Sequence, residues 1–391
     1  VVVTFNSDSS ELARRMNLEA AKAVRWGGVA PQDALDFVTL NAARQLGIDH
    51  RLGSLEAGKD ADLVIWSASP LSVYAVAEQT WVDGVREFDR ASDLATREAV
   101  AAERAALIDR IRADKQAKKG GDKPSGNGKK SKADRKSKPD GEGGGKNDTE
   151  PQPAAAARPY EDRLASRSGT VSLVGGTVHT VAGEVIETGT VSFRNGRLVE
   201  IGPGLPPLTD AEVVDVAGKH VLPGYIETLS TLGLTEIGRV AASNDIRETG
   251  EVNPDVLTDL AVNPDSELIP VARTGGLTPA LAAPAGGLVS GRSALIRLDG
   301  WTWEDLRATA PTALHVTWPR VSVRRPLSFG PPPPSEEKQE KEREEKLARI
   351  DDLLDAARAY AKARAAGDAP TVDARPRLEA MLPVLDGDVP V

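Results

Sequence analysis

The first 50 residues predict two helices, and in the second of them apolar side chains recur every three or four positions. The first helix is expected from about Ser10 to Arg25, where the Gly27-Gly28 pair ends it. The second is expected from Pro31 to Gly47, because proline suits the first turn of a helix. Its buried face is formed by Leu35, Val38 and Ala42.

Short runs of β-branched and aromatic residues predict strands in two parts of the chain. In the first part, strands are expected at residues 1–5, 62–67 and 79–82, and the last leads into a turn at Asp83-Gly84. In the second part, glycine turns separate strands expected at residues 171–173, 177–180, 190–193 and 198–201. Asn195-Gly196 is a strong hairpin signal between two of them. Short strands at such regular spacing predict a small β-sandwich.

The middle of the chain changes from a charged helix to a segment almost without aliphatic side chains. The helix is expected from Asp93 to Lys115. Its apolar contacts are expected at Leu94, Leu107, Ile108 and Ile111. Residues 116–159 consist mainly of Lys, Gly, Ser, Asp and Pro. Such a segment cannot offset the entropy lost on ordering, so we interpret it as a disordered linker.

Beyond residue 223, apolar runs at 278–283, 294–298 and 313–318 alternate with irregular polar segments. A long helix is expected after Pro331–Pro334, because Ser335 suits an N-cap and the next turn is rich in Glu. Gly367 is expected to end this helix. One face of this helix carries an apolar stripe, which indicates core packing rather than a partner site. Its members are Leu347, Ile350, Leu353, Leu354, Ala357 and Tyr360.

Composition narrows the class of protein. The 391 residues are enough for two or three domains, and the formal net charge of -9 argues against a general nucleic-acid binder. No cysteine is present, which excludes disulfides, thiolate metal sites and thiol nucleophiles. No apolar run approaches the roughly 18 residues that a membrane helix needs, so no membrane partner is expected. The chain shows no signal peptide, but it begins without Met within a predicted strand. The compartment therefore stays open between bacterial cytoplasm and periplasm.

Three segments carry a family resemblance. The first is Asn41-Ala42-Ala43-Arg44-Gln45-Leu46-Gly47, and the second runs from Gly53-Ser54-Leu55-Glu56-Ala57-Gly58-Lys59-Asp60 to Ala61-Asp62-Leu63-Val64-Ile65-Trp66. The third is Gly218-Lys219-His220-Val221-Leu222-Pro223-Gly224-Tyr225-Ile226-Glu227. They resemble the amidohydrolase superfamily of metal-dependent hydrolases, in particular its imidazolonepropionase-like members. In that family the third string opens the catalytic barrel and the first two close the polypeptide. The reversed order predicts that the chain is a slice of a tandem two-module protein.

The resemblance implies an α/β fold with partial (β/α)8 TIM-barrel elements and the small composite β-sandwich of amidohydrolases. Residues 1–115 would hold the C-terminal part of the first module, with its last barrel strand, helices and sandwich strands. After the linker at 116–159, residues 160–222 would supply sandwich strands of the second module, and residues 223–391 the first part of a degenerate barrel. Because unpaired strand edges are costly, we also expect strands 62–67 and 79–82 to pair with the strands of residues 171–201.

The resemblance places one candidate catalytic residue in the first module. Asn6-Ser7-Asp8 resembles the end of the eighth barrel strand, where the family's Asp binds metal and accepts a proton from the bound water. Asp8 is therefore the expected catalytic and metal-binding residue, in an intact first module only. The expected cofactor is a divalent metal, with zinc preferred, in the intact parent module, and none is expected for this chain alone. Read without the family, an Asp after a strand is more often a turn former.

The second module departs from the family at its first metal site. The family's barrel opens with Pro-Gly-x-Ile-Asp-x-His-x-His, whereas Leu229 and Thr231 occupy the two histidine positions here. His179 and His220 fall in the expected sandwich as packing or surface residues, and His315 on an apolar strand is more often a hydrogen-bonded core histidine than a ligand. Glu236, Asp245 and Glu248 could instead bind a cation together. Their spacing is not diagnostic, and loop carboxylates are usually solvated.

A glycine-rich loop at residues 285–293 offers a weak substrate-side site at Arg292 and Ser293. It lacks the patterns of nucleotide-binding loops, so no nucleotide cofactor is expected.

Three functions remain in competition. The leading one is an amidohydrolase-like hydrolase acting on carbon–nitrogen bonds other than peptide bonds in a small-molecule substrate. This chain is then an incomplete and inactive piece of it. The second is a non-catalytic binding or scaffold protein, which Leu229 and Thr231 favour and Asp8 disfavours. The third, a nucleic-acid tether through residues 116–159, is disfavoured because acidic residues are interspersed there and aromatics are absent. Assembly into an oligomer stays open.

Overall fold

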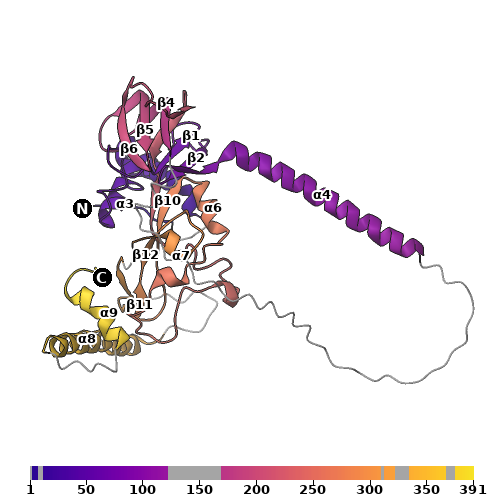
Figure 1. Cartoon of the computed structure of the whole chain (residues 1–391). Coiled ribbons are helices and arrows are strands. Elements are labelled where there is room, and N and C mark those ends of the chain that lie inside the picture. The colour runs from indigo at the N-terminus through magenta and orange to yellow at the C-terminus, as the bar shows by residue number, and fades with distance from the viewer. Residues whose placement is uncertain (1, 8–11, 122–168, 310–311, 322–333, 367–374) are drawn as a thin grey trace, which may run out of the picture. The chain divides into compact units, whose positions relative to one another are not determined.

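The computed structural model describes residues 2–7, 12–121, 169–309, 312–321, 334–366 and 375–391. The chain divides into two compact units, one of Val1–Arg90 with Pro159–Val391 and one of Ala91–Arg158. Figure 1 shows the elements of each. The larger unit contains all sheets of the described residues. It is built from the chain segments before and after the smaller unit, which connects them.

The N-terminal residues form short helices, not a strand and two long helices. The described part of the expected first strand, Val2–Phe5, lies in no sheet, so that prediction was wrong. The first helix is present as η1 (Ala13–Arg15) and α1 (Met16–Gly27). Gly28 ends it with φ 67°, a left-handed conformation that costs glycine little.

The expected second helix is broken into α2 (Pro31–Asp36) and α3 (Leu40–Gln45). Thr39 causes the interruption, because its backbone is non-helical (φ -133°, ψ -94°) and its hydroxyl donates a hydrogen bond to the carbonyl of Leu35 at 2.6 Å. The expected buried face is nevertheless confirmed, since Leu35, Val38 and Ala42 are all buried.

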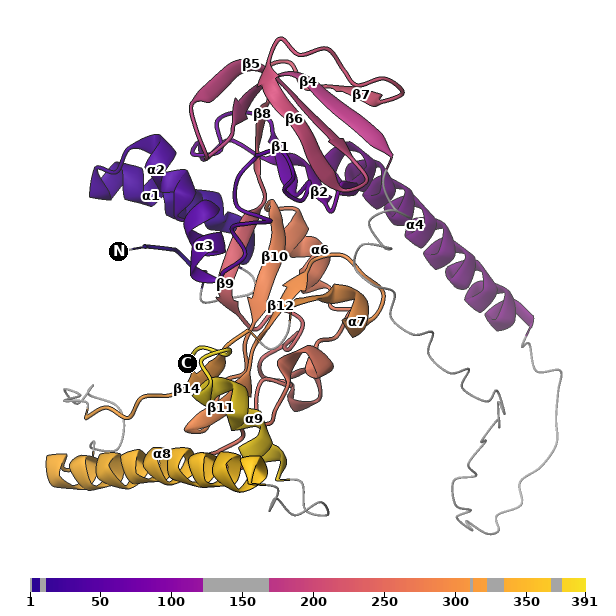
Figure 2. The ribbon, with the colours of Figure 1, turned by 60° about the vertical axis from the view of Figure 1, so that its left-hand side comes forward.

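Eight strands form the largest sheet, and they come from both sides of the connection. They are β1 (Leu63–Trp66), β2 (Ala77–Val82), β3 (Val85–Asp89), β4 (Thr170–His179), β5 (Val185–Arg194), β6 (Arg197–Pro203), β7 (Glu212–Asp215) and β8 (His220–Pro223). The order is β3-β2-β1-β8-β4-β5-β6, and β7 pairs with β4. In Figure 2 the indigo strands β1 and β2 lie beside the magenta strands β4 to β8. The two groups of strands thus share a sheet as expected, although β1 pairs with β8 and not with a strand of residues 171–201.

Both expected hairpin turns are confirmed. Asp83-Gly84 (φ 50° and 74°) joins β2 to β3, and Asn195-Gly196 (φ 51° and 72°) joins β5 to β6. Two residues with positive φ are typical of the tight turns that match the strand twist. The turn tips touch, because a Cβ atom built on Gly84 would lie 2.9 Å from the Cα atom of Gly196.

A second, open sheet contains β9 (Tyr225–Ser230), β10 (Leu277–Ala282), β12 (Ala294–Arg297) and β13 (Arg307–Thr309) in the order β13-β12-β10-β9. Only β9 and β10 are parallel within it. No sheet among the described residues closes into a barrel. A separate pair joins β11 (Val289–Arg292) to β14 (Leu314–Val316). The helices of this region are η2 (Ala241–Ser243), η3 (Thr258–Ala261), α6 (Leu268–Arg273) and α7 (Trp303–Leu306).

The C-terminal helices α8 (Glu336–Ala365) and α9 (Pro376–Leu385) share an apolar cluster with β11 and β14. Ser335 caps α8 as expected, since its hydroxyl accepts a hydrogen bond from the backbone N–H of Lys338. The predicted core stripe is confirmed for three of its residues, because Ala357 is fully buried and Leu353 and Leu354 pack against the cluster. Gly367 and Pro331–Pro333 lie outside the described residues.

Helix α4 (Arg90–Gly121) belongs to the smaller unit and differs from its prediction in two ways. It runs beyond Lys115 to Gly121, so the first residues of the expected linker are helical, and the rest of 116–159 lies outside the described residues. Its four expected apolar contacts are exposed: Leu94, Leu107, Ile108 and Ile111. Like the other described helices, α4 is not both long and apolar enough to cross a membrane.

Candidate functional site

The described N-terminal residues are attached to helices α2 and α3 by hydrogen bonds. The backbone N–H of Phe5 donates to the carbonyl of Phe37 at 3.0 Å, and the Asn41 amide donates to the carbonyl of Val3 at 3.1 Å. The Phe5 and Phe37 rings meet edge to face. These contacts fix the path of the chain up to Ser7, the residue before Asp8. Asp8 itself lies outside the described residues.

Ser7 meets the strand that carries the third family segment. Its backbone N–H lies 3.1 and 3.2 Å from the two carboxylate oxygens of Glu227 on β9. Glu227 is fully buried and also accepts a hydrogen bond from the N–H of Leu229 at 3.4 Å. A buried carboxylate needs such donors, because burial without them is costly. The structure thus brings Ser7 of the Asn6-Ser7-Asp8 segment to Glu227, the last residue of the third family segment.

The residues at this point do not fit a bound metal. Leu229, in the first histidine position, is 41% exposed and has no donor atom, and Thr231 offers only a neutral hydroxyl. Glu227 is occupied by backbone N–H groups. No group of three or more His, Asp or Glu side chains that could hold an ion is found in the described part of the chain. The family's divalent metal therefore has no matching set of ligands among these residues.

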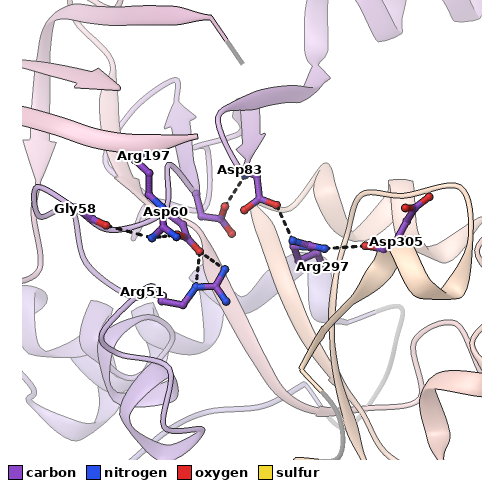
Figure 3. A network of polar contacts seen from close by, with 8 residues as sticks. Arg51, Gly58, Asp60, Asp83, Arg197, Arg297 and Asp305 are labelled. Carbon is purple, nitrogen blue, oxygen red and sulfur yellow. Dashed lines mark hydrogen bonds and ion pairs between the residues drawn. The ribbon is translucent and has the colours of Figure 1, made fainter. Parts of the chain in front are cut away.

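A buried ion network lies close to the glycine turn at residues 58–60. Asp60 is 2% exposed and pairs with two arginines, Arg51 at 2.6 Å and Arg197 at 2.5 Å. Arg197 also donates to the carbonyl of Gly58 at 3.2 Å. Figure 3 shows the Asp60 carboxylate between the two guanidinium groups, one from each side of the connection. Bidentate and shared arginine contacts of this kind position chains and leave no open carboxylate for chemistry.

A second pair continues this network. Arg297 lies 3.1 Å from the Asp83 carboxylate and donates to the carbonyl of Asp305 at 2.9 Å (Figure 3). Asp62 accepts the backbone N–H of Asp83 at 2.7 Å. Burial and the neighbouring Asp83 and Asp60 charges raise the pKa of Asp62. The sequence motif supplies the aspartates, but no local pattern marks Arg197 and Arg297 as their partners.

His179 and His220 form a pair that sequence reasoning missed. Their rings stack with centroids 5.2 Å apart, and Nε2 of His179 lies 2.9 Å from Nδ1 of His220. Burial, and then the charge of His220, lower the pKa of His179 to about 4, and burial lowers the pKa of His220. Nδ1 of His179 has no partner among the described residues. An N–H there would be an unsatisfied buried donor, so the arrangement favours a proton on Nε2, donated to His220.

The remaining candidates stand apart from this region. His315 pairs with Gly291 across β14 and β11, and burial lowers its pKa. Burial lowers the pKa of Arg292 on β11, although the nearby charges of Asp255 and Asp259 act in the opposite direction and raise it. Ser293 is fully buried, and its hydroxyl donates to the carbonyl of Ala313 at 3.3 Å.

Two of the three loop carboxylates, Glu236 and Asp245, line one pocket of about 420 Å³ with polar neighbours that include Asn244 and Asn263. Glu248 is not among the residues that line it.

Comparison with known proteins shows that the N-terminal part of the chain is similar to a family of enzymes. The model of the amidohydrolase family matches residues 3–87. This range includes Ser7, Asp60 and Asp83. Amidohydrolase tasK of Hapsidospora irregularis is 43% identical over 86 residues, which are 22% of this chain and 9% of that protein. The imidazolonepropionase of Thermoplasma volcanium is 43% identical over 67 residues, or 17% of each protein.

A shorter match, to the imidazolonepropionase of Erwinia tasmaniensis, is 59% identical over 39 residues, or 10% of each protein. The matched region spans less than a fifth of each of these relatives. An amidohydrolase structure from Thermotoga maritima aligns over 56% of this chain and 57% of its own, with a TM-score of 0.48 and 22% identity. Residues 3–87 of the chain are thus similar to the amidohydrolase family.

Proposed function

We propose that the protein containing this chain is a hydrolase that acts on carbon–nitrogen bonds other than peptide bonds in small molecules. The observation that carries the proposal is the match of residues 3–87 to amidohydrolases and imidazolonepropionases. When bound, a divalent metal would supply an activated water to such a reaction. Asp8 is the residue of this chain that we propose for metal binding and proton transfer. It follows Ser7, which Glu227 holds.

We further propose that the described residues form a framework and not the metal centre. Leu229 and Thr231 replace the histidines of the family motif, and Glu227 is engaged by the N–H groups of Ser7 and Leu229. The donors present do not fit the metal, so no reaction step is assigned to them. This chain alone is accordingly expected to be inactive.

The parallel neighbours β9 and β10 are the elements that we propose as partial barrel strands, since parallel pairing is the rule within such barrels. The eight-stranded sheet is the element that we propose as the composite sandwich. The tandem order of modules remains a prediction of the sequence.

A second candidate function is a non-catalytic binding or scaffold protein. The same observation at Leu229 and Thr231 favours it, because a leucine has no donor atom and a neutral hydroxyl is a poor metal ligand. The two proposals differ in whether Asp8 does chemistry in the longer protein or only ends a structural segment.

Metal analysis and hydrolysis assays on the purified chain test the framework proposal. The chain is incubated with zinc, desalted, and offered hydantoins, imidazolones and N-acyl amino acids. We expect far less than one equivalent of retained metal and no turnover. Stoichiometric metal with turnover that is lost in Asp8→Asn, but kept in the exposed control Asp355→Asn, would refute it. Repeating the assay on the longest natural polypeptide that carries this sequence separates the two functions: turnover that depends on Asp8 supports the hydrolase, and its absence supports the scaffold.

A further inference from the structure

The larger unit is assembled from two segments of the chain, residues 2–90 (the N-terminal segment) and residues 169–391 (the C-terminal segment). They meet in a backbone ladder between β1 and β8. Four residue pairs are in antiparallel register: Leu63 with Pro223, Val64 with Leu222, Ile65 with Val221, and Trp66 with His220. Because β1 also pairs with β2 and β8 with β4, the ladder lies in the interior of the sheet. Neither segment could leave without exposing two strand edges.

Three apolar cores among the described residues also contain both segments, and the smallest joins Ala42 and Ile48 to Ile226 and Leu281. One joins helix α1 and strand β1 of the N-terminal segment to β9 and β10 of the C-terminal segment. Another joins Leu63, Ile65 and Trp81 to Leu173, Phe193 and other residues of β4 to β8. Two ring contacts cross the boundary, Trp66 with Tyr225 at 5.7 Å and Trp81 with Phe193 at 5.3 Å. Gly275 approaches the backbone of Arg14 so closely that no side chain would fit between them.

Charged groups across the boundary are matched one to one. Among the described residues, four ion pairs join the segments: Asp60–Arg197 at 2.5 Å, Glu78–Lys219 at 2.6 Å, Glu87–Arg273 at 2.9 Å and Asp83–Arg297 at 3.1 Å. In each pair the N-terminal segment supplies the carboxylate and the C-terminal segment supplies the cation. Such one-sided complementarity is typical of recognition between partners.

We propose that the C-terminal segment is a binding surface for the N-terminal segment and holds it without the covalent connection through residues 91–168. Most of that connection belongs to a separate compact unit, Ala91–Arg158. A covalent tether acts on a preformed pair only by raising the effective concentration of one partner near the other. The contacts that specify the pair are the β1–β8 ladder, the three cores and the four ion pairs. The proposal is independent of any catalytic activity.

Cleavage of the full-length protein tests this. A recognition sequence for a specific protease is inserted within residues 122–168, and complete cleavage is verified on a denaturing gel. We expect the cleaved protein to elute as one species at micromolar concentration, with both pieces at 1:1 in native mass spectrometry. Its melting temperature should fall on tenfold dilution, while that of the uncleaved protein should not. Separate elution of the pieces, or precipitation of the cleaved protein alone, would overturn the proposal.

Asp60 provides matched variants, because it pairs with Arg51 inside its own segment and with Arg197 across the boundary. In the cleaved complex, Arg197→Gln should raise the dissociation constant several-fold and more than Arg51→Gln does. Arg358→Gln, which removes an exposed pair within α8, should leave the dissociation constant unchanged. An unchanged dissociation constant in Arg197→Gln, or an equal rise in Arg358→Gln, would also overturn the proposal.

Discussion

Asp83 and Arg297 are 214 residues apart in the chain, yet their side chains form an ion pair in which both are less than a tenth exposed. The pair joins the turn after β2 to the end of β12. Burial of two charges costs several kcal/mol per ion unless each is paired. The contact is therefore more sensitive to the loss of one partner than to the loss of both.

Removal of one charge of this pair should be strongly destabilising. Asp83→Asn keeps the turn, since asparagine also adopts a positive φ, but leaves the Arg297 charge buried. We expect a loss of about 3–5 kcal/mol for Asp83→Asn or Arg297→Met alone. The double variant should lose less than the sum of the two. Urea unfolding monitored by circular dichroism measures each value, and additive losses would contradict the coupling.

Two glycines allow steric crowding to be separated from backbone strain. Gly53 (φ 90°) and Gly58 (φ 91°) have nearly the same positive φ. A Cβ atom on Gly53 would lie 2.7 Å from the Cβ atom of Ala43, whereas nothing lies within 4 Å of one on Gly58. Both Ala variants carry the strain of a positive φ. Only Gly53→Ala adds overpacking, so it should lose about 1–3 kcal/mol more in thermal or urea unfolding. Equal losses would show that the helix beside Gly53 can move away.

The His179–His220 pair predicts a loss of stability in mild acid. The pKa of His179 is about 4 in the folded protein, below its ordinary value of 6.5, chiefly because of burial. The unfolded chain therefore binds more protons between these values, and stability should fall as pH drops from 6.5 to about 4. One such group gives at most about 1.4 kcal/mol per pH unit.

The His179→Asn variant should flatten this part of the pH profile, measured as the unfolding free energy in urea at several pH values. The exposed control His50→Asn should leave the slope as in the wild-type protein. If His179→Asn keeps the full slope, the histidine pair is not its source.

Asp62 predicts a pH dependence of the opposite sign. Burial, then the charges of Asp83 and Asp60, raise its folded pKa above the ordinary value of 3.8. Folded protein then holds a proton that the unfolded chain has lost, so stability falls as pH rises above about 4.

Asp62→Asn removes this titration and keeps an oxygen to accept the N–H of Asp83. The variant should gain stability relative to wild type as pH increases from 4 to 8, in urea unfolding at matched ionic strength. A constant difference across this range would mean that Asp62 is already ionised in the folded protein. Asp355→Asn, at an exposed site on α8, serves as the control.

Local chemistry made part of this fold predictable. Gly28 ends α1, Ser335 caps α8, and Asn195-Gly196 closes a hairpin, because each feature depends on a few neighbouring residues. The single helix expected from Pro31 to Gly47 was wrong, because the Thr39 hydroxyl binds the Leu35 carbonyl and no periodicity records that competition.

Long-range pairing could be anticipated only in outline. The sharing of a sheet by strands on both sides of the connection followed from the family resemblance, but the use of β8 as the joining strand did not. The contact of Ser7 with Glu227 and the choice of Arg297 for Asp83 depend on chain paths that no local pattern determines. Asp8 rests on its motif alone, since it lies outside the described residues.

The contact of the turn tips at Gly84 and Gly196 limits how the two halves of the large sheet can change during evolution. The Gly196 tip occupies the space into which the Gly84 tip would grow, since even one added carbon on Gly84 would meet the Gly196 backbone. Insertions that lengthen one hairpin should therefore occur in relatives only together with a shorter or displaced second hairpin. The lengths of the two loops are therefore expected to change together, although more than a hundred residues separate the loops in the chain.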